Sequence, residues 1–326
     1  MDVRFIDAEG AHQYDGADVV DLLNREDGFV WVDVPVWDDE VEKLLIHELD
    51  CHPLVVDACR QRNHVPSSHS YTDHHFVILH TPLLGQAGHV HLLELDQIVG
   101  SNYLVTVHGP INPAVEQDEA LVETSSVLRR IGSGRFAPSS PAEMSYALGS
   151  AVARRQRALI GDVAEKLPDL EQHVMTSRFR EPEALLEKMF LIRHELITAR
   201  TMAAQSHDVY ARLGSLDRFA SDDERAFARD LADQFDRARS VGDGEAQFLF
   251  GVIELYQTKV NTKMTVAMER LAVIAAITLP VTAIASVYGM NVIANKQNWL
   301  QLVIVLVIMV AISGMLLQWA RRQGWW

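Results

Sequence analysis

Two uncharged apolar segments near the C-terminus constrain the fold of this 326-residue chain more than any other feature. Residues 271–290 and 299–319 contain no Asp, Glu, Lys or Arg. Each has about the 20 residues that an α-helix needs to cross the hydrocarbon core of a bilayer. Because only residues 291–298 separate them, the sequence predicts a hairpin of two transmembrane helices joined by a short loop.

Basic residues on the far sides of these segments indicate the orientation of the hairpin. They are Lys259, Lys263, Arg270, Arg321 and Arg322. Lys and Arg are enriched on the cytoplasmic side of membrane proteins. We therefore expect a multi-pass protein of the inner (plasma) membrane with both termini in the cytoplasm, an external loop at 291–298 and a basic cytoplasmic tail at 320–326. The N-terminus lacks the basic stretch and apolar run of a signal peptide, so it is expected to stay in the cytoplasm.

The charge of the chain lies almost entirely before the apolar segments. Residues 1–270 contain 26 basic and 44 acidic side chains, a net charge of −18. This charge argues against nucleic acid as a partner, because phosphate binding requires a basic face. It is compatible with multivalent cations. An acidic surface also keeps a protein soluble without any such role, so charge alone does not decide between these explanations.

Residues 1–270 divide into a part with short strand patterns and a part with long helical patterns. Residues 1–112 alternate short runs rich in β-branched and aromatic residues, such as FVWVDV and NYLVTVH, with helical spacing of apolar residues. Beyond them, a helical region at 113–221 and a stalk helix at 222–270 are expected. No proline occurs between Pro182 and Pro280, so the stalk helix should continue into the membrane. The predicted fold class is an α/β cytoplasmic N-terminal domain followed by long helices, with an all-α stalk and a two-helix transmembrane hairpin.

Glycine and proline positions refine this organisation, because both residues interrupt regular structure. Within the helical region they favour helices at about 114–131, 142–178 and 182–212. In the α/β domain, Gly85 and Gly88 predict the turn of a β-hairpin.

The sequence lacks the motifs of the common enzyme classes. Residues 1–270 contain no phosphate-binding loop, no GxSxG and no HExxH, so neither catalysis nor an organic cofactor is expected. Eleven of the fourteen histidines fall between His12 and His108. They lack the spacing of a tight metal site, so surface or strand positions are expected for them. Cys51 and Cys59 form no disulfide framework, as in a reduced cytosolic protein.

The stalk and the first apolar segment share a stripe of small and polar residues. Read in heptads, one position carries Glu254, Asn261, Met268, Ala275, Thr282 and Gly289, and the other Thr258, Thr265, Ala272, Leu279 and Ser286. A dry coiled-coil seam prefers Ile, Val and Leu, whereas polar residues at membrane depth usually face a bundle interior or a water-filled cavity. The stripe indicates either a water-filled path around the axis of an oligomer or close helix packing through small residues.

The end of the first apolar segment carries Tyr288, Gly289, Met290 and Asn291. This YGMN sequence resembles the signature that ends the first transmembrane helix in the CorA family of magnesium and other divalent metal-ion channels. The resemblance covers nearly the whole chain. It includes the two C-terminal apolar segments, Pro280 within the first, the long helix before it, and the α/β beginning with its NYLVTVH run.

This resemblance implies a homopentameric channel for passive uptake of Mg2+, and also of Co2+ or Ni2+. The selectivity filter would be Gly289, Met290 and Asn291, with a ring of Asn291 amides around an ion that gives up its water reluctantly. The heptads and the resemblance together give the pore-lining candidates: Glu254, Asn261, Thr265, Met268, Leu271, Ala275, Leu279, Thr282 and Ser286. Met268 with Leu271 or Leu279 would form hydrophobic constrictions. Leu271 comes from the resemblance alone, since the heptads select Ala272.

The resemblance also implies a regulatory site, because family members are thought to close when cytoplasmic Mg2+ binds between acidic residues of neighbouring domains. Asp230 matches such a residue on the stalk helix. The acidic pair that follows an HPL motif in the family reads Asp57 and Ala58 here, so Asp57 is the candidate partner. The metal-binding candidates are therefore Asn291, Asp230 and Asp57. The external loop also departs from many relatives, since it contains Lys296 and no acidic residue.

Two alternatives stay open at this point. The first is the zinc-transporting branch of the same superfamily, which usually departs from GMN at its middle residue. Met290 argues against it, whereas the histidines and the acid-free loop favour it. The second is a membrane-anchored sensor with no transport, which would not need the polar stripe.

Overall fold

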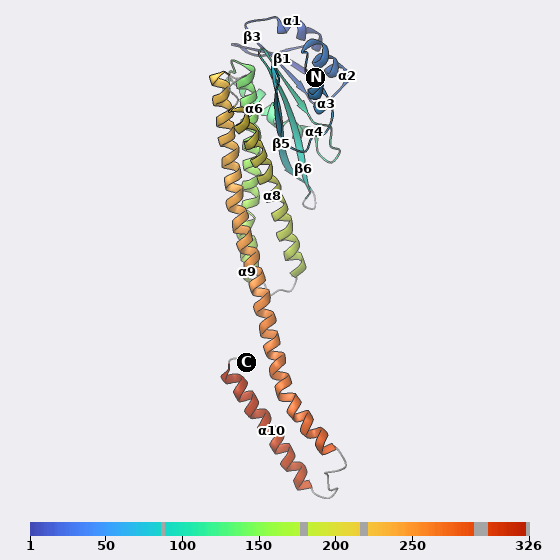
Figure 1. Ribbon diagram of the computed structural model, residues 1–326, viewed down its shortest axis with the longest axis vertical. Coiled ribbons are helices and arrows are strands. Elements are labelled where there is room, and N and C mark those ends of the chain that lie inside the picture. Colours follow the sequence, from blue (N-terminus) through green and yellow to red (C-terminus); the bar gives the residue numbers. More distant parts are fainter. Residues whose placement is uncertain (86–88, 177–181, 216–220, 290–298, 324–326) are drawn as a thin grey trace. The chain divides into compact units, whose positions relative to one another are not determined.

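The computed structural model describes residues 1–85, 89–176, 182–215, 221–289 and 299–323. The chain forms two compact units, Met1–Phe250 and Gly251–Trp326. The expected fold class is confirmed, because a mixed α/β sheet domain precedes long helices and two apolar C-terminal helices (Figure 1).

The first unit is built on a seven-stranded sheet. Its strands are β1 (Asp2–Asp7), β2 (Gly10–Tyr14), β3 (Gly28–Val34), β4 (Ser67–Ser70), β5 (His74–Leu84), β6 (Val90–Gly100) and β7 (Tyr103–His108). They lie in the order β2-β1-β3-β7-β6-β5-β4. The central neighbours β3 and β7 run parallel, with Val32 opposite Val105, and the other neighbours run antiparallel. Central strands buried on both faces read as continuous apolar runs, which accounts for the sequences FVWVDV and YLVTVH.

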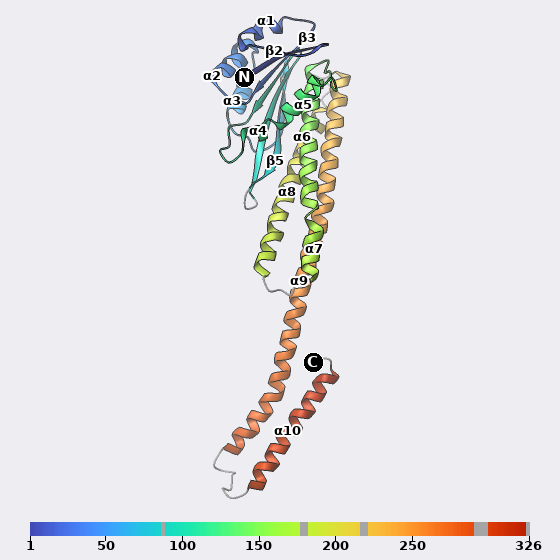
Figure 2. The same ribbon diagram turned by 180° about the vertical axis from the view of Figure 1, so that it is seen from behind.

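Helices cover both faces of this sheet. On one face, α1 (Val19–Leu23), α2 (Asp39–Lys43) and α3 (Pro53–Arg60) share a core with strand residues that include Phe5, Val32 and Val105. On the other face, α5 (Val122–Gly132) and α6 (Pro141–Ala164) pack against Trp31 and Leu104. Further along this second face, α8 (Pro182–Leu213) and α9 (Asp222–Gly289) pack against Val77 and Leu79. Figures 1 and 2 show the short and the long helices on opposite sides of the sheet.

The helix expected at 142–178 is wrong in its extent, because two helices occupy these residues. α6 ends at Ala164, and α7 spans Leu167–Thr176. Pro168 explains the division: its nitrogen carries no hydrogen to continue the ladder of α6, and proline is well tolerated in the first turn of a new helix. The short α4 (Gln117–Ala120) and α5 likewise divide the expected helix at 114–131.

Strands β5 and β6 pair as the hairpin that the glycines predict. The backbone N–H of Gly85 donates to the carbonyl of His89 at 2.7 Å, and Leu84 pairs with Val90. Gly88 lies outside the described residues.

The helix α9 contains 68 residues and is the longest element described. At its start, Ser221 and Glu224 each accept a hydrogen bond from the other's backbone N–H, at 3.2 and 2.7 Å, which satisfies N–H groups that the helix itself leaves unbonded. Pro280 lies within it, and the carbonyl four residues earlier consequently lacks its helical donor. The other apolar helix is α10 (Trp299–Arg322). Both α9 and α10 are long and apolar enough to cross a membrane.

Candidate functional site

The pore-lining candidates all lie at exposed positions of α9 in the single chain. Among the apolar ones, Met268 is 58% exposed, Leu271 65% and Leu279 68%. Large apolar side chains left uncovered over several turns indicate a surface that contacts lipid or another chain. The row therefore remains available to line a shared path in an oligomer.

The buried side of α9 in this segment lies away from the row of pore-lining candidates. Val273 is 1% exposed, and Ile277, Pro280, Val281 and Ile284 are half-buried. At about 100° per residue, the row of pore candidates lies roughly 150° around the helix from these residues. Packing within the second unit thus covers one side of α9 and leaves nearly the opposite side open.

The angle of about 100° per residue also separates Ala272, which the heptads place in the row, from Leu271, which the family resemblance places there. Ala272 and Leu271 are both exposed. Ala272 lies near the middle of the row that contains Met268 and Leu279, whereas Leu271 lies at the edge of the row.

The threonines of α9 hold their hydroxyl groups in one orientation. Thr282 donates to the carbonyl of Thr278 at 2.8 Å, and Thr265 donates to the carbonyl of Asn261 at 3.0 Å. Because the hydroxyl proton is directed to the backbone, the oxygen lone pairs stay free to accept hydrogen bonds. The waters around a cation direct their hydrogens outward, so acceptor groups of this kind suit a hydrated divalent ion.

One of the three residues of the expected selectivity filter lies at the end of α9. Gly289 is the last helical residue. Positive φ angles among the described glycines occur at Gly10 and Gly134, so Gly289 does not use the left-handed conformation that glycine permits. Met290 and Asn291 lie outside the described residues.

The stalk carboxylate Asp230 belongs to a small polar cluster between α6 and α9. Its Oδ2 accepts hydrogen bonds from the Tyr146 hydroxyl and from the Gln234 amide, both at 2.6 Å. These two bonds, the Tyr146 bond first, hold the pKa of Asp230 below its ordinary value. Asp230 is exposed, so its second oxygen can reach a cation from solvent or from another chain.

The candidate partner Asp57 lies on α3 and is half exposed. Its Oδ1 accepts a hydrogen bond from Arg60 at 2.6 Å, and the same arginine lies 3.7 Å from Glu42. Among the described residues, no group of three or more His, Cys, Asp and Glu side chains could hold a metal ion. The structure therefore does not assemble Asp57 and Asp230 into a metal site within one chain.

Three histidines of the sheet each contact a carbonyl or carboxylate oxygen of the protein. His80 is fully buried, and its Nε2 lies 3.0 Å from the carbonyl oxygen of Asn63; burial lowers its pKa. His108 Nε2 lies 3.0 Å from Asp33, and His74 Nδ1 lies 2.8 Å from Asp73. These contacts suit the strand and surface positions that the sequence predicts.

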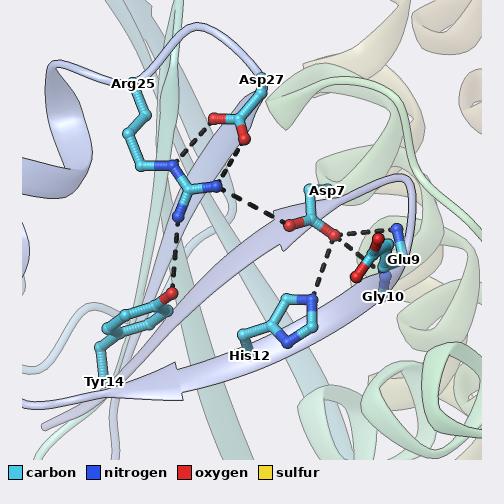
Figure 3. Close-up of polar contacts among 7 residues, drawn as sticks. All are labelled: Asp7, Glu9, Gly10, His12, Tyr14, Arg25 and Asp27. Carbon is cyan, nitrogen blue, oxygen red and sulfur yellow. Dashed lines mark hydrogen bonds and ion pairs between the residues drawn. The ribbon is translucent and has the colours of Figure 1, made fainter.

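A further polar cluster closes the hairpin of β1 and β2 (Figure 3). Asp7 accepts hydrogen bonds from the backbone N–H groups of Glu9 and Gly10 at 2.9 and 3.2 Å, and it lies 3.1 Å from His12. Gly10 has a φ of +135°, which L side chains rarely adopt. The cluster fixes the turn at this edge of the sheet and is structural.

The sequence analysis does not predict that two carboxyl groups on β6 are buried. Asp96 is 0% exposed and Glu94 6%. Burial, followed by the charge of Glu94, raises the pKa of Asp96 well above its ordinary value. Burial also raises the pKa of Glu94, although Asn63 donates to its carboxylate from both backbone and side chain. In sequence these acids alternate with apolar residues, as in a strand with one solvated face, so nothing local reveals their burial.

Comparisons with known proteins place this geometry in context. A family model described as CorA-like Mg2+ transporter protein matches residues 26–322. A curated relative from Bacillus subtilis, named "Putative metal ion transporter YfjQ", is 23% identical over 299 residues, which cover 90% of this chain and 89% of the relative. The zinc transport protein ZntB of Yersinia pseudotuberculosis is 25% identical over 174 residues, 51% of this chain and 50% of that protein.

A solved structure supports the fold over the whole length. The CorA magnesium transporter from Methanocaldococcus jannaschii matches with a TM-score of 0.78 at 18% sequence identity, over 100% of this chain and 99% of that one. At this level of identity the likeness establishes the fold, including the long helices that lead into the apolar segments.

Proposed function

The chain belongs to the CorA-like Mg2+ transporter family, and from this premise we propose that it is a homopentameric channel for passive entry of Mg2+ into the cytoplasm. As a member of this family it is a divalent metal-ion transporter and not an enzyme. The proposal adds the preferred ion, the number of subunits, the passive mechanism and the position of the filter.

The observation that carries the proposal is the open row on α9. Residues of this row are exposed, lie nearly opposite the buried side of the helix, and include threonine oxygens with free lone pairs. Five copies of such a row around an axis would line a path with acceptors for a hydrated ion. The row leads to Gly289 and the GMN sequence, where the Asn291 amides would form the outer ring.

The membrane potential supplies enough free energy for this transport. Each elementary charge that moves inward through 100 mV gains about 2.3 kcal/mol, and a divalent ion gains twice as much. We therefore assign no ATP requirement to the channel. Residues 1–270 and 320–326 would lie in the cytoplasm, and residues 291–298 outside.

Flux through the purified protein in liposomes tests the proposal. We expect influx of Mg2+ to a dye inside the vesicles, rising as the potential is made more negative inside, with Co2+ and Ni2+ passing as well. Liposomes without protein serve as the control. A folded oligomer that passes no Mg2+ at low internal Mg2+ would exclude the magnesium channel. Zn2+ uptake by the same vesicles would then support zinc transport, the function in the name of ZntB. Absence of flux for every ion tested would support a membrane anchor with no transport.

We further propose that Asp230 contributes to closure of the channel by cytoplasmic Mg2+. Its free oxygen is exposed, and its ionised form is stabilised by Tyr146 and Gln234. Because Asp57 lies on another element and pairs with Arg60, a second carboxylate would have to come from a neighbouring subunit.

Half-inhibition of the flux in the variant Asp230→Asn is expected to require an internal Mg2+ concentration about tenfold higher than in the wild type. The loss of one charged contact of about 1.4 kcal/mol corresponds to that factor. Asp233→Asn removes the same charge from an exposed position one turn away and should leave inhibition unchanged. An ordinary aspartate is ionised at about pH 6 and the pKa of Asp230 is lower still, so wild-type inhibition should persist at that pH. If internal Mg2+ inhibits the Asp230→Asn and Asp233→Asn variants at the same concentration, Asp230 has no specific role in closing the channel.

A further inference from the structure

A cavity of about 390 Å³ lies between α6 and α9 in the first unit. These two helices run side by side in both views (Figures 1 and 2). The cavity is lined by Ser150, Ala153, Arg154, Arg157, Ala158, Gln234 and Arg237, and we call it the arginine pocket. Its volume falls within the range of about 300–1,000 Å³ that is usual for small-molecule sites.

The residues from α6 form one face of that helix. Ser150, Ala153, Arg154, Arg157 and Ala158 recur at the spacing of three and four residues that brings helical side chains together. The two alanines leave the space open, because their side chains are too short to fill it. The arginines at its border are exposed, so their guanidinium groups reach the pocket from its solvent side.

The three guanidinium groups around the pocket lack carboxylate partners. Within the described ranges, Arg154, Arg157 and Arg237 form no ion pair. Nearby arginines do: Arg155 pairs with Glu119 at 2.6 Å, and Arg239 pairs with Asp236. Among residues 1–270, which contain 44 acidic and 26 basic side chains, three arginines without ion pairs around one cavity form a local positive site.

One acid beside this site is already engaged. Asp230 accepts hydrogen bonds from Tyr146 and Gln234, and the charge of Arg237 contributes to lowering its pKa. The Gln234 amide also lies 3.2 Å from the Ser150 hydroxyl. None of the seven residues that line the pocket is acidic, so its own lining carries a positive excess.

We propose that the arginine pocket binds a small anion that carries a chain of phosphate groups, either inorganic polyphosphate or the phosphate tail of a nucleotide. The planar guanidinium group presents N–H donors in a fork that matches the oxygens of phosphate. Arg154 and Arg157 would hold the anion from α6, Arg237 would contact it from α9, and the Ser150 hydroxyl would donate to a further oxygen. The cavity is larger than one phosphate group requires, which favours a chain over orthophosphate.

Calorimetric titration of the purified full-length protein in detergent tests this inference without any measurement of ion flux. Tripolyphosphate, ATP and orthophosphate are the three probes. Buffers must be free of divalent ions, because phosphate oxygens bind Mg2+ themselves. We expect saturable binding of tripolyphosphate and ATP with similar affinity, near one per chain, and at least about tenfold weaker binding of orthophosphate.

The double variant Arg154→Gln with Arg157→Gln is expected to weaken tripolyphosphate binding by at least about tenfold for each charged contact removed. Arg129→Gln with Arg212→Gln removes the same charge from exposed positions outside the pocket and should bind as the wild type does. Circular dichroism and the molar mass of the oligomer report whether the variants fold and assemble.

Four results would overturn the inference. The first is absence of tripolyphosphate binding to the wild type, and the second is equal weakening in the two double variants, which would show non-specific attraction. The third is a combined result, in which the wild type binds none of the phosphate probes and the pocket variant loses the oligomer. The arginines would then pair with carboxylates of a second copy. Binding of ATP without tripolyphosphate would also exclude recognition through the phosphate chain.

Discussion

Replacing Asn291 with alanine is expected to lower Mg2+ influx into liposomes by about a hundredfold while leaving the assembly of the protein unchanged. In the proposed pentamer, the amides form a ring that hydrogen-bonds the water around the ion. A single hydrogen bond contributes about 1 kcal/mol, and each 1.4 kcal/mol changes a rate tenfold. Loss of several bonds at once therefore produces a large effect on flux, which stopped-flow dye measurements resolve.

A matched control lies in the same loop. Asn298→Ala removes the same amide from the other end of residues 291–298 and should keep wild-type influx. If both variants conduct as the wild type does, the filter does not reside in the GMN sequence. If both fail equally while the oligomer persists, the loop as a whole affects conduction, and the specific role of Asn291 is refuted.

Truncation of Leu279 to alanine is expected to increase Mg2+ flux at high internal Mg2+ by about tenfold or more. Leu279 is 68% exposed on the open row of α9, where a ring of leucines would close the path by excluding water. Alanine widens such a ring and reduces its apolar surface, so water and ions should enter the closed state. Flux measured after loading vesicles with inhibitory Mg2+ isolates this leak from ordinary conduction.

Ile274→Ala provides the comparison for this gate. Ile274 is 51% exposed on the same stretch of α9, but the helical angle places it well away from the row of Leu279. We expect no leak from this variant. Equal leaks from both variants would mean that loss of apolar surface destabilises the membrane segment generally, and no leak from Leu279→Ala would remove it as a constriction.

The parts of the fold that sequence predicts well depend on local properties. The apolar segments are recognised because lipid excludes charge, and the absence of charge is visible residue by residue. The continuation of α9 from the stalk into the apolar segment is predicted by the absence of proline before Pro280. By contrast, the pairing of β3 with β7 joins residues such as Val32 and Val105, and no short-range signal indicates which distant strands become neighbours.

The errors and omissions have similarly specific causes. The helix expected at 142–178 ignored Pro168, whose missing N–H ends one helix and begins another. Asp230 was selected by family resemblance, but its partner Tyr146 lies 84 residues away in sequence and becomes its neighbour only when α6 packs on α9. Asp96 alternates with apolar residues like an exposed strand position, and only the helices on that face bury it.

The continuity of α9 restricts how this protein can change in length during evolution. The helix runs without interruption from Asp222 to Gly289, so a residue inserted within the open row, between Asn261 and Thr282, turns everything beyond it by about 100°. Thr282 would then leave the row, although every contact on either side of the insertion stayed intact. An insertion of seven residues restores the facing to within about 20°. The two ends of the open row therefore keep one facing only while the number of residues between them is held, and viable insertions or deletions within the row come in steps close to whole pairs of turns.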